Sequence, residues 1–460
     1  MRRLTLAALI GIAGSMLSAC SSVPVVDDRV GAEGAAPEVV GVRGPLTERQ
    51  AKAVLAKLGA GGQDILARHM AVEQAVAETP LVAGNRTRVL HDGPTSFQAI
   101  FAAIHGAKHH INLEYYTLED VASDGESLSD LLLAKRREGV AINIIYDSFG
   151  SSETPDGFFD QLKQAGVQFL KFHPMNPLEG GGLLYSLNDR DHRKILVGDG
   201  STAIVGGVNL SKSYESRTFA LSSAPKTDEA ALPWRDTDLE IDGPAAKAVQ
   251  QVFLDHWQRE GGPTLADADF FPVVPAQGQE VLRIIGSTPE NGVPRYYVTV
   301  LSAIRTAETR IWLTAAYFAP TEQEMQDLEA AARRGVDVEL LLPDTSDSEM
   351  SINVQHSNYT ELLEAGAKIF ETHGEVLHSK TMAVDGVWSV IGSSNFDHRS
   401  ILFNDEIDAV CVGRDTAGNL EAGFQDAIAR ARPITRAAWQ ERALGERLEE
   451  FFSRAWQSLL

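Results

Sequence analysis

A polar motif occurs twice in this chain, and this repetition constrains the fold more than any other feature of the sequence. The first copy runs from His192 to Asn209 and the second from His378 to Asn395, and both fit the pattern H-x-K-x4-D-x6-G-[GS]-x-N. In each copy the asparagine lies 17 positions after the histidine, and the two copies are 186 residues apart. Two extended copies of one pattern indicate a duplicated structural unit.

The sequence before each motif is repeated as well. An apolar stretch is followed by a helical pattern that ends in basic residues and Gly-Val, then by a second apolar stretch, and later by an Ala-Gly pair. These segments lie at 111–116, 135–140, 142–146 and 165–166 in the first half, and at 311–317, 332–336, 338–342 and 365–366 in the second. Apolar strands that alternate with helices indicate βαβ units. We therefore predict an α/β protein made of two tandem βα repeats, whose mixed central sheets pack together and share one active site at their interface.

The motif itself predicts a site for a phosphodiester. Residues two apart on a strand share a face, so His192 and Lys194 point the same way, as do His378 and Lys380, whereas Arg193 points to the opposite face. Paired repeats can place both sets around one cleft. The lysines suit the non-bridging phosphate oxygens. One histidine can attack phosphorus, while the other protonates the leaving alcohol and then deprotonates the incoming one.

These motifs resemble those of the phospholipase D superfamily, most closely its bacterial cardiolipin synthase branch. The resemblance extends over about residues 84–415 and includes the segments 188–191, 234–237 and 242–244. It implies two phospholipase D-like repeats, at 84–262 and 278–415. We also expect an N-terminal helical segment at 46–83 and a C-terminal one at 416–460, where apolar residues recur at helical spacing. The resemblance implies a catalytic set that consists of His192, Lys194, Asp199, His378, Lys380 and Asp385, with Asn209 and Asn395 as phosphate-binding amides.

The resemblance also implies a carboxylate downstream of each motif that orients the histidine, because a nucleophilic imidazole needs its second nitrogen held by an acceptor. We expect Asp236 to serve the first half and Glu406 the second, with Asp238 as the alternative to Asp236. Asp199 and Asp385 lie at an odd spacing from their histidines, near a strand end. We expect these two aspartates to hold backbone or turn geometry and not to transfer protons.

The expected reaction is phosphatidyl transfer that forms cardiolipin from phosphatidylglycerol, or from a related donor, through a covalent phosphatidyl-histidine. The resemblance leaves open which histidine attacks, and we favour His192. The alternative is a phospholipase D that hydrolyses phospholipids to phosphatidic acid. We expect membrane phospholipids as substrates, no cofactor, and no metal, because the lysines supply the positive charge that a metal would provide. The sequence does not indicate an oligomeric state.

The N-terminus predicts export and lipid attachment. Arg2 and Arg3 precede an apolar stretch at 4–16, and Leu17-Ser18-Ala19-Cys20 resembles a bacterial lipobox. We expect a lipoprotein signal peptide at 1–19, lipidation of Cys20 and a tether at 20–45; an ordinary cleaved signal or an uncleaved anchor is the alternative. Ser21 follows, with no Asp to indicate inner-membrane retention. We therefore expect a periplasm-facing lipoprotein of the outer membrane, held in the cell envelope by several acyl chains.

Composition argues against a nuclease of the same superfamily. The chain has 41 Lys and Arg against 63 Asp and Glu, a net charge of -22, whereas binding to nucleic acid depends on neutralised phosphates. We expect no nucleic-acid partner. Two further features are given structural roles: His109-His110 is interpreted as an exposed helix end, and the Ser-, Ala- and Thr-rich span 214–232 as a surface loop.

Overall fold

The computed structural model describes residues 23, 38–58, 79–174, 189–215, 232–266, 268–289, 294–442, 453, 454 and 457. The expected signal peptide, Cys20 and most of the expected tether lie outside these residues. Within the described ranges, no helix has both the length and the apolar character that crossing a bilayer requires.

The first half folds around a mixed sheet with parallel strands at one side and antiparallel strands at the other. From side to side the strands are β8 (Gln168–Phe172), β7 (Ala141–Asp147), β4 (His110–Tyr115), β10 (Lys194–Gly198), β11 (Thr202–Gly206), β13 (Asp238–Asp242) and β3 (Leu81–Leu90). Its helices are α4 (Gly93–Gly106), α5 (Leu128–Arg137), α6 (Asp156–Gln164) and α7 (Ala246–Arg259). Smaller elements are β5 (Ala122–Ser123), β6 (Glu126–Ser127) and the 3-10 turn η1 (Lys212–Tyr214).

The second half repeats this arrangement strand for strand. In the corresponding order the strands are β17 (Lys368–Glu371), β16 (Asp337–Leu342), β15 (Arg310–Ala315), β19 (Lys380–Val384), β20 (Trp388–Gly392), β21 (Asn404–Val412) and β14 (Glu280–Ser287). Its helices are α8 (Arg295–Thr306), α9 (Glu322–Arg333), α10 (Glu349–Ser357), α11 (Tyr359–Ala365), α12 (His398–Leu402) and α13 (Arg414–Ile428). The duplicated α/β fold with mixed sheets is therefore confirmed.

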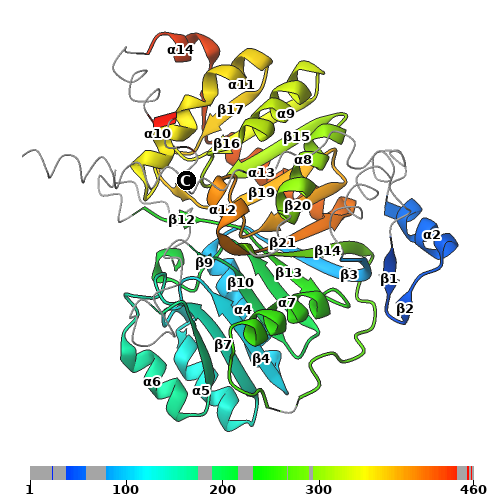
Figure 1. Ribbon diagram of the computed structural model, residues 1–460, viewed down its shortest axis with the longest axis vertical. Coiled ribbons are helices and arrows are strands. Elements are labelled where there is room, and N and C mark those ends of the chain that lie inside the picture. Colours follow the sequence, from blue (N-terminus) through cyan, green and yellow to red (C-terminus); the bar gives the residue numbers. More distant parts are fainter. Residues whose placement is uncertain are drawn as a thin grey trace, which may run out of the picture.

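The two halves are joined at a shared sheet edge and by a common core. Strands β3 and β14 pair antiparallel, so the sheets meet where the halves adjoin in Figure 1. Ile195 and Val197 of β10 pack in a core that also contains Ile391 and Ala409 of the second half. Leu196, on the opposite face of β10, packs in the core of the first half. Because β10 is buried on both faces, it is a continuous apolar run.

Helix starts follow from local sequence. Asp92 caps α4, accepting a hydrogen bond from the Thr95 amide at 2.8 Å. Thr321 and Glu324 form a capping box at the start of α9, in which each side chain bonds the other residue's amide. Such caps satisfy amides that have no partner within the helix.

Three expectations about the flanking segments need correction. The tether does not extend to residue 45, because β1 (Val39–Gly41) pairs with β3 and with β2 (Gly44–Pro45), and Val39 is buried. The C-terminal segment is not wholly helical: β22 (Arg432–Ile434) pairs with β17 and precedes α14 (Arg436–Gln440). His110 is not at a helix end but begins β4 and is buried. In both flanking segments the chain departs from the expectation because a short strand pairs with a sheet strand: β1 with β3, and β22 with β17.

Asp199 and Asp385 occupy equivalent turns in the two halves. Their backbones are left-handed, with φ of 51° and 54°. The Asp199 carboxylate accepts hydrogen bonds from three successive amides, those of residues 108–110, at 2.7, 2.8 and 2.9 Å. Asp385 does the same for residues 308–310, at 2.9, 2.7 and 3.0 Å. Both aspartates fix the turn that precedes a central strand. The resemblance placed them in the catalytic set, and the structure corrects this: they hold the backbone, as their spacing from the histidines predicted.

We expect Asp199→Ala and Asp385→Ala to destabilise the protein without removing its chemistry. Each change leaves amides at the strand start without an acceptor, which lowers the free energy of unfolding by about 1–3 kcal/mol. Asp→Asn keeps one acceptor oxygen and tolerates the left-handed backbone, so its effect is smaller. Thermal unfolding and turnover per folded molecule measure the two effects. Lost turnover at an unchanged melting temperature would place these aspartates among the reacting groups.

Candidate active site

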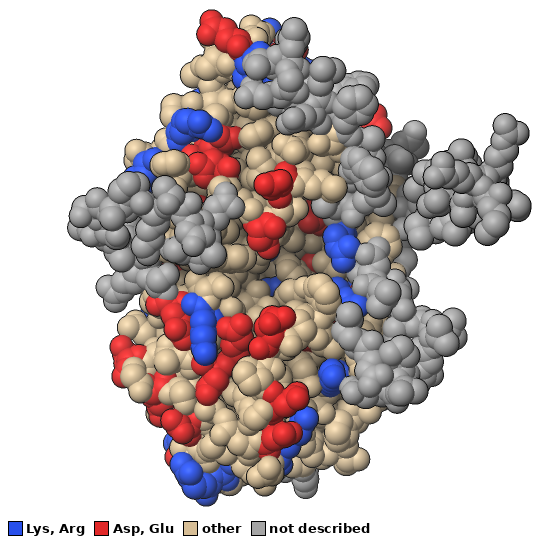
Figure 2. Space-filling view, turned by 90° about the vertical axis from the view of Figure 1, so that its left-hand side faces the viewer, with Lys and Arg blue, Asp and Glu red and all other residues tan. Residues whose placement is uncertain are grey.

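A cavity of about 430 Å³ lies between the two halves, and both copies of the motif contribute to its wall. His192 and Asn209 line it from the first half, and His378 and Asn395 from the second. Figure 2 shows the side of the molecule on which β9 and β12 lie in Figure 1, with a hollow between the halves. Blue atoms of Lys and Arg are visible in this hollow, whereas red acidic side chains are numerous on the surrounding surface. Basic side chains are therefore exposed in the hollow of a surface that is otherwise rich in acidic ones.

Short strands cross between the halves beside each histidine. β9 (Arg190–Asp191) pairs in parallel with the start of β21, and β18 (Val376–Leu377) pairs in parallel with β12 (Trp234–Arg235). The His192 amide donates to the Asp405 carbonyl at 2.9 Å, and the His378 amide donates to the Arg235 carbonyl at 2.7 Å. The backbone of each histidine is therefore held by the opposite half.

The same crossing exchanges the carboxylates. Nδ1 of His192 lies 3.0 Å from Glu406 Oε2, and Nδ1 of His378 lies 2.6 Å from Asp236 Oδ2. The structure thus brings both predicted acids to the site, but the expected pairing of each acid with the histidine of its own half is wrong. The alternative, Asp238, instead accepts the Val208 amide at 3.1 Å. Neither half alone contains an active-site histidine together with the carboxylate that orients it.

One position of the motif is Gly207 in the first copy and Ser393 in the second, and this difference follows from the lengths of the two acids. A Cβ on Gly207 would lie 2.1 Å from Asp236 Oδ1, so the short aspartate requires glycine here. At the equivalent position Ser393 donates to Glu406 Oε2 at 2.5 Å. Ser400 also donates to this carboxylate, at 2.9 Å. The two halves therefore hold their acids by different contacts.

Both lysines are buried beside their histidines. Lys194 Nζ donates to the His192 carbonyl at 2.6 Å, and Lys380 Nζ lies 2.8 Å from His378 Nδ1. Burial lowers the pKa of Lys194 to about 7 and that of Lys380 to about 8. Each ammonium has three donors, so these contacts leave donors for an anion. An anionic phosphate between the lysines would raise both pKa values.

Burial favours the neutral form of both imidazoles. Burial lowers the pKa of His192 to about 4, although Glu406 opposes this shift. Burial and the nearby Lys380 ammonium also lower the pKa of His378. Since Nδ1 of each ring faces a carboxylate, Nε2 is the nitrogen left for chemistry. A neutral His192 can act as a nucleophile, and His378 gains a proton more readily once an anion is bound.

Aromatic residues complete the cavity, and the sequence analysis missed them. The ring of Tyr116 lies 5.5 Å from that of His192, and Lys194 Nζ lies 5.5 Å from the Tyr116 centroid. The Tyr214 hydroxyl is 2.9 Å from His378 Nδ1, and Trp234 and Tyr317 lie 5.2 and 5.9 Å from the His378 ring. Tyr116 directly follows β4, and Tyr317 lies two residues after the end of β15, so the ends of the repeated strands are the signal that could have found them. Tyr214 opens the span interpreted as a surface loop, so composition concealed its role.

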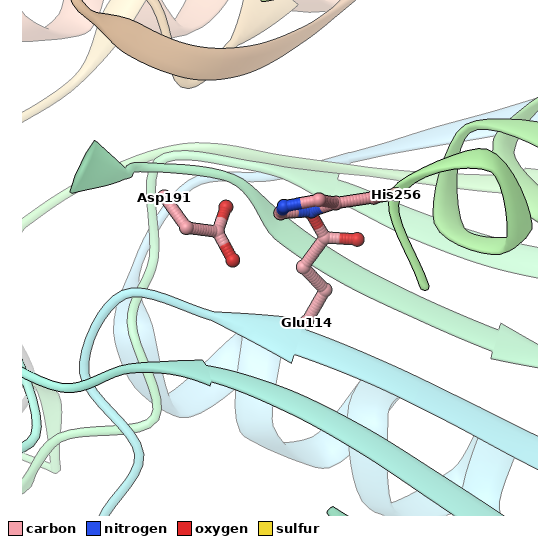
Figure 3. Close-up of side chains that lie close together, drawn as sticks. All are labelled: Glu114, Asp191 and His256. Carbon is pink, nitrogen blue, oxygen red and sulfur yellow. The ribbon is translucent and has the colours of Figure 1, made fainter. Parts of the chain in front are cut away.

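A buried charge network lies behind His192. Arg193, on the opposite strand face as predicted, donates to the Glu406 carbonyl at 3.1 Å and to Glu114 Oε1 at 3.3 Å. Figure 3 shows Glu114 beside His256, with Asp191 facing them; Nδ1 of His256 is 2.7 Å from Glu114. Because Arg193 already neutralises Glu114, we interpret the cluster as a charge-balanced support for Glu406 and not as a cation site.

We expect Lys194→Met to stabilise the protein while abolishing turnover. The pKa of Lys194 is about 7 in the folded protein against an ordinary value of 10.5. Between these values the unfolded chain binds a proton that the folded protein does not, so burial of Lys194 destabilises the fold less as pH rises. The difference in melting temperature between Lys194→Met and the wild-type protein should therefore become smaller between pH 7 and about pH 9. The exposed Lys108→Met is the matched control; a lower melting temperature for Lys194→Met would contradict the expected burial penalty.

The family model that matches this chain and two of its relatives are described as cardiolipin synthases. A family model described as "Cardiolipin synthase, PLD-like domain" matches residues 100–256 and 300–428. The chain is 33% identical over 387 residues to a cardiolipin synthase of Geobacillus sp. (strain WCH70), covering 84% of this chain and 74% of the relative. It is 32% identical over 405 residues to a cardiolipin synthase of Halalkalibacterium halodurans, covering 87% and 74%.

The fold also matches a solved structure. The crystal structure of phosphatidylserine synthase from Haemophilus influenzae Rd KW20 superimposes with a TM-score of 0.60 at 13% identity. The match covers 84% of this chain and 97% of that one. At this identity the likeness concerns the fold alone.

Proposed function

The chain belongs to the cardiolipin synthase, PLD-like domain family of the phospholipase D superfamily, and we propose that it forms cardiolipin from phosphatidylglycerol through a phosphatidyl-histidine. One observation carries this proposal: the partly buried imidazole of His192 and the buried imidazole of His378 face one cavity, and each is oriented by a carboxylate from the opposite half. This arrangement suits a double displacement at phosphorus, in which one ring bonds to phosphorus while the other moves protons.

In the first step, Nε2 of His192 attacks the phosphorus of the donor phosphatidylglycerol. The N–P bond forms and the P–O bond to the glycerol head group breaks. His378, protonated in the presence of the anionic phosphate, gives its proton to the departing glycerol oxygen. Glu406 stabilises the positive charge that develops on the His192 ring. We assign attack to His192, whose pKa burial lowers to about 4, so that its ring is neutral as a nucleophile must be.

In the second step, the terminal hydroxyl of another phosphatidylglycerol attacks the phosphatidyl-histidine. His378 accepts the hydroxyl proton, the new O–P bond forms, and the N–P bond breaks to release cardiolipin. Lys194 and Lys380 stabilise the negative oxygens on phosphorus in both steps, with the amides of Asn209 and Asn395 as neutral donors. Asn209 is positioned for this because its Oδ1 accepts the Thr117 amide at 3.2 Å, which leaves its NH₂ to donate.

Transfer must compete with hydrolysis, since water can also attack the intermediate. Water is present at about 55 M, whereas an oriented reactant can reach an effective molarity of about 10⁵–10⁸ M. Aromatic side chains around both histidines reduce the room for water in the cavity. These features favour a lipid alcohol over water as the second nucleophile.

We expect phosphatidylglycerol vesicles to give cardiolipin and free glycerol, with phosphatidic acid as a minor product. His192→Ala and His378→Ala should each abolish turnover, because the rings supply different steps. The exposed His105→Ala is the control. Mass spectrometry of the lipid products decides the reaction: phosphatidic acid as the main product at saturating phosphatidylglycerol would instead identify a hydrolase. Substantial turnover by either active-site variant would contradict the two-histidine mechanism.

We also propose that the mature protein is a lipoprotein anchored through Cys20 and facing the periplasm from the outer membrane. The lipobox-like sequence at 17–20 supports this proposal. Cys20→Ser should abolish metabolic labelling with fatty acid and release the protein from outer-membrane fractions after cell fractionation. Wild-type protein grown and fractionated in parallel is the reference. Continued labelling of the serine variant would contradict lipidation at Cys20.

A further inference from the structure

The cavity is asymmetric although the motif is duplicated. Arg190 and Arg399 line it, and both lie close enough to Tyr116 for their positive charges to act on its hydroxyl. Burial nevertheless raises the pKa of Tyr116 to about 12. Since Tyr116 packs edge-on against His192, these two arginines belong to the His192 side of the cavity. The His378 side carries three aromatic rings, those of Tyr214, Trp234 and Tyr317.

The two arginines reach this place from different halves. Arg190 is in β9, directly opposite Asn404 of β21 in the strand register. Arg399 is in α12, the helix that leads into β21. Arg190 is buried, with its guanidinium 3.7 Å from Asp147 and 5.6 Å from the centre of the Phe149 ring, whereas Arg399 is half-buried. Both sit at the end of β21 that also carries Glu406.

Neither arginine is part of the duplication. Arg190 lies two residues before His192, and the equivalent residue before His378 is Val376. Arg399 lies four residues after Asn395, and the equivalent residue after Asn209 is Ser213. The duplicated histidines, lysines and asparagines already provide for the reacting phosphate. Arg190 and Arg399 are therefore guanidinium groups of the cavity beyond the duplicated set, and the carboxylates of Asp347 and Asp397 line the cavity with them.

We propose that Arg190 and Arg399 form a second phosphate-binding subsite, which holds the intact phosphodiester of the acceptor lipid. This inference rests on the proposed function. In the transfer step the acceptor hydroxyl oxygen bonds to phosphorus, the His192 N–P bond breaks, and the hydroxyl proton passes to His378. The acceptor's own phosphodiester is unchanged and needs only to be held.

The chemistry of the acceptor suits this pair of arginines. In phosphatidylglycerol a glycerol unit joins the phosphate to the attacking hydroxyl, so the second phosphate must lie within one glycerol length of the reacting phosphorus. Guanidinium groups bind phosphate oxygens through paired N–H donors, which fixes orientation as well as charge. Water and simple alcohols lack this phosphate. The subsite therefore favours an anionic lipid acceptor over the solvent.

The test measures competition between two acceptors for one intermediate. Phosphatidylglycerol vesicles are incubated with protein in the presence of ethanol, and cardiolipin and phosphatidylethanol are quantified by mass spectrometry. Both products arise from the same phosphatidyl-histidine, but only cardiolipin formation uses a second phosphate. For Arg399→Gln the ratio of cardiolipin to phosphatidylethanol should fall by about tenfold or more, the effect of losing one charge-assisted hydrogen bond.

Three further variants test whether the change in the ratio of cardiolipin to phosphatidylethanol is specific to the two arginines of the cavity. Arg190→Gln should lower the same ratio, with its melting temperature measured because Arg190 is buried. Arg399→Lys keeps the charge without the paired donors and should give an intermediate ratio. The control is Arg333→Gln, which changes an exposed arginine of α9 paired with Glu329 and should keep the wild-type ratio.

Two outcomes would overturn the subsite. In Arg399→Gln, an unchanged ratio of cardiolipin to phosphatidylethanol would mean that Arg399 does not select the acceptor. This holds whether the amounts of the two products stay the same or fall by the same factor. A wild-type protein that makes phosphatidic acid and phosphatidylethanol but no cardiolipin would overturn the proposed function itself. The two failures are therefore distinguishable within one set of reactions.

Discussion

The hydrogen bond from each active-site imidazole to a carboxylate of the opposite half is the interaction on which the rest of this structure depends. It requires β9 and β18 to leave their own sheets and pair with β21 and β12. That crossing in turn requires the two sheets to be joined at β3 and β14 and to share an apolar core. The duplicated fold is thus organised around two contacts that neither repeat can make alone.

Burial at this site serves chemistry at the expense of stability. Burial lowers the pKa values of both lysines and both histidines, so positive charge is disfavoured until an anion enters. The surrounding structure must tolerate this penalty, and the buried network of Arg193 and Glu114 stabilises the backbone that carries Glu406. A site of this kind binds an anionic substrate partly because binding relieves the penalty.

The sequence predicted the parts of this protein that repeat. The duplicated α/β fold with mixed sheets followed from two matching patterns, and both orienting acids were implied by the family resemblance. The exchange of Asp236 and Glu406 could not be predicted, because strand alternation fixes which face a side chain occupies but not which sheet the strand joins. Arg190 and Arg399 escaped for a related reason: each occurs in only one half, so no second copy marked it. Short edge strands such as β1 and β22 have too few residues to show a period.

The crossing of β9 with β21 also has a consequence for synthesis of the chain. A ribosome completes the first half, including His192 and Lys194, long before Glu406 is made. Until then His192 lacks its carboxylate, and His378 with its own lysine does not yet exist. A chain that ends before β21 therefore lacks the carboxylate that orients His192. The exchange makes synthesis through Glu406 a condition for assembling both histidine–carboxylate pairs within one chain.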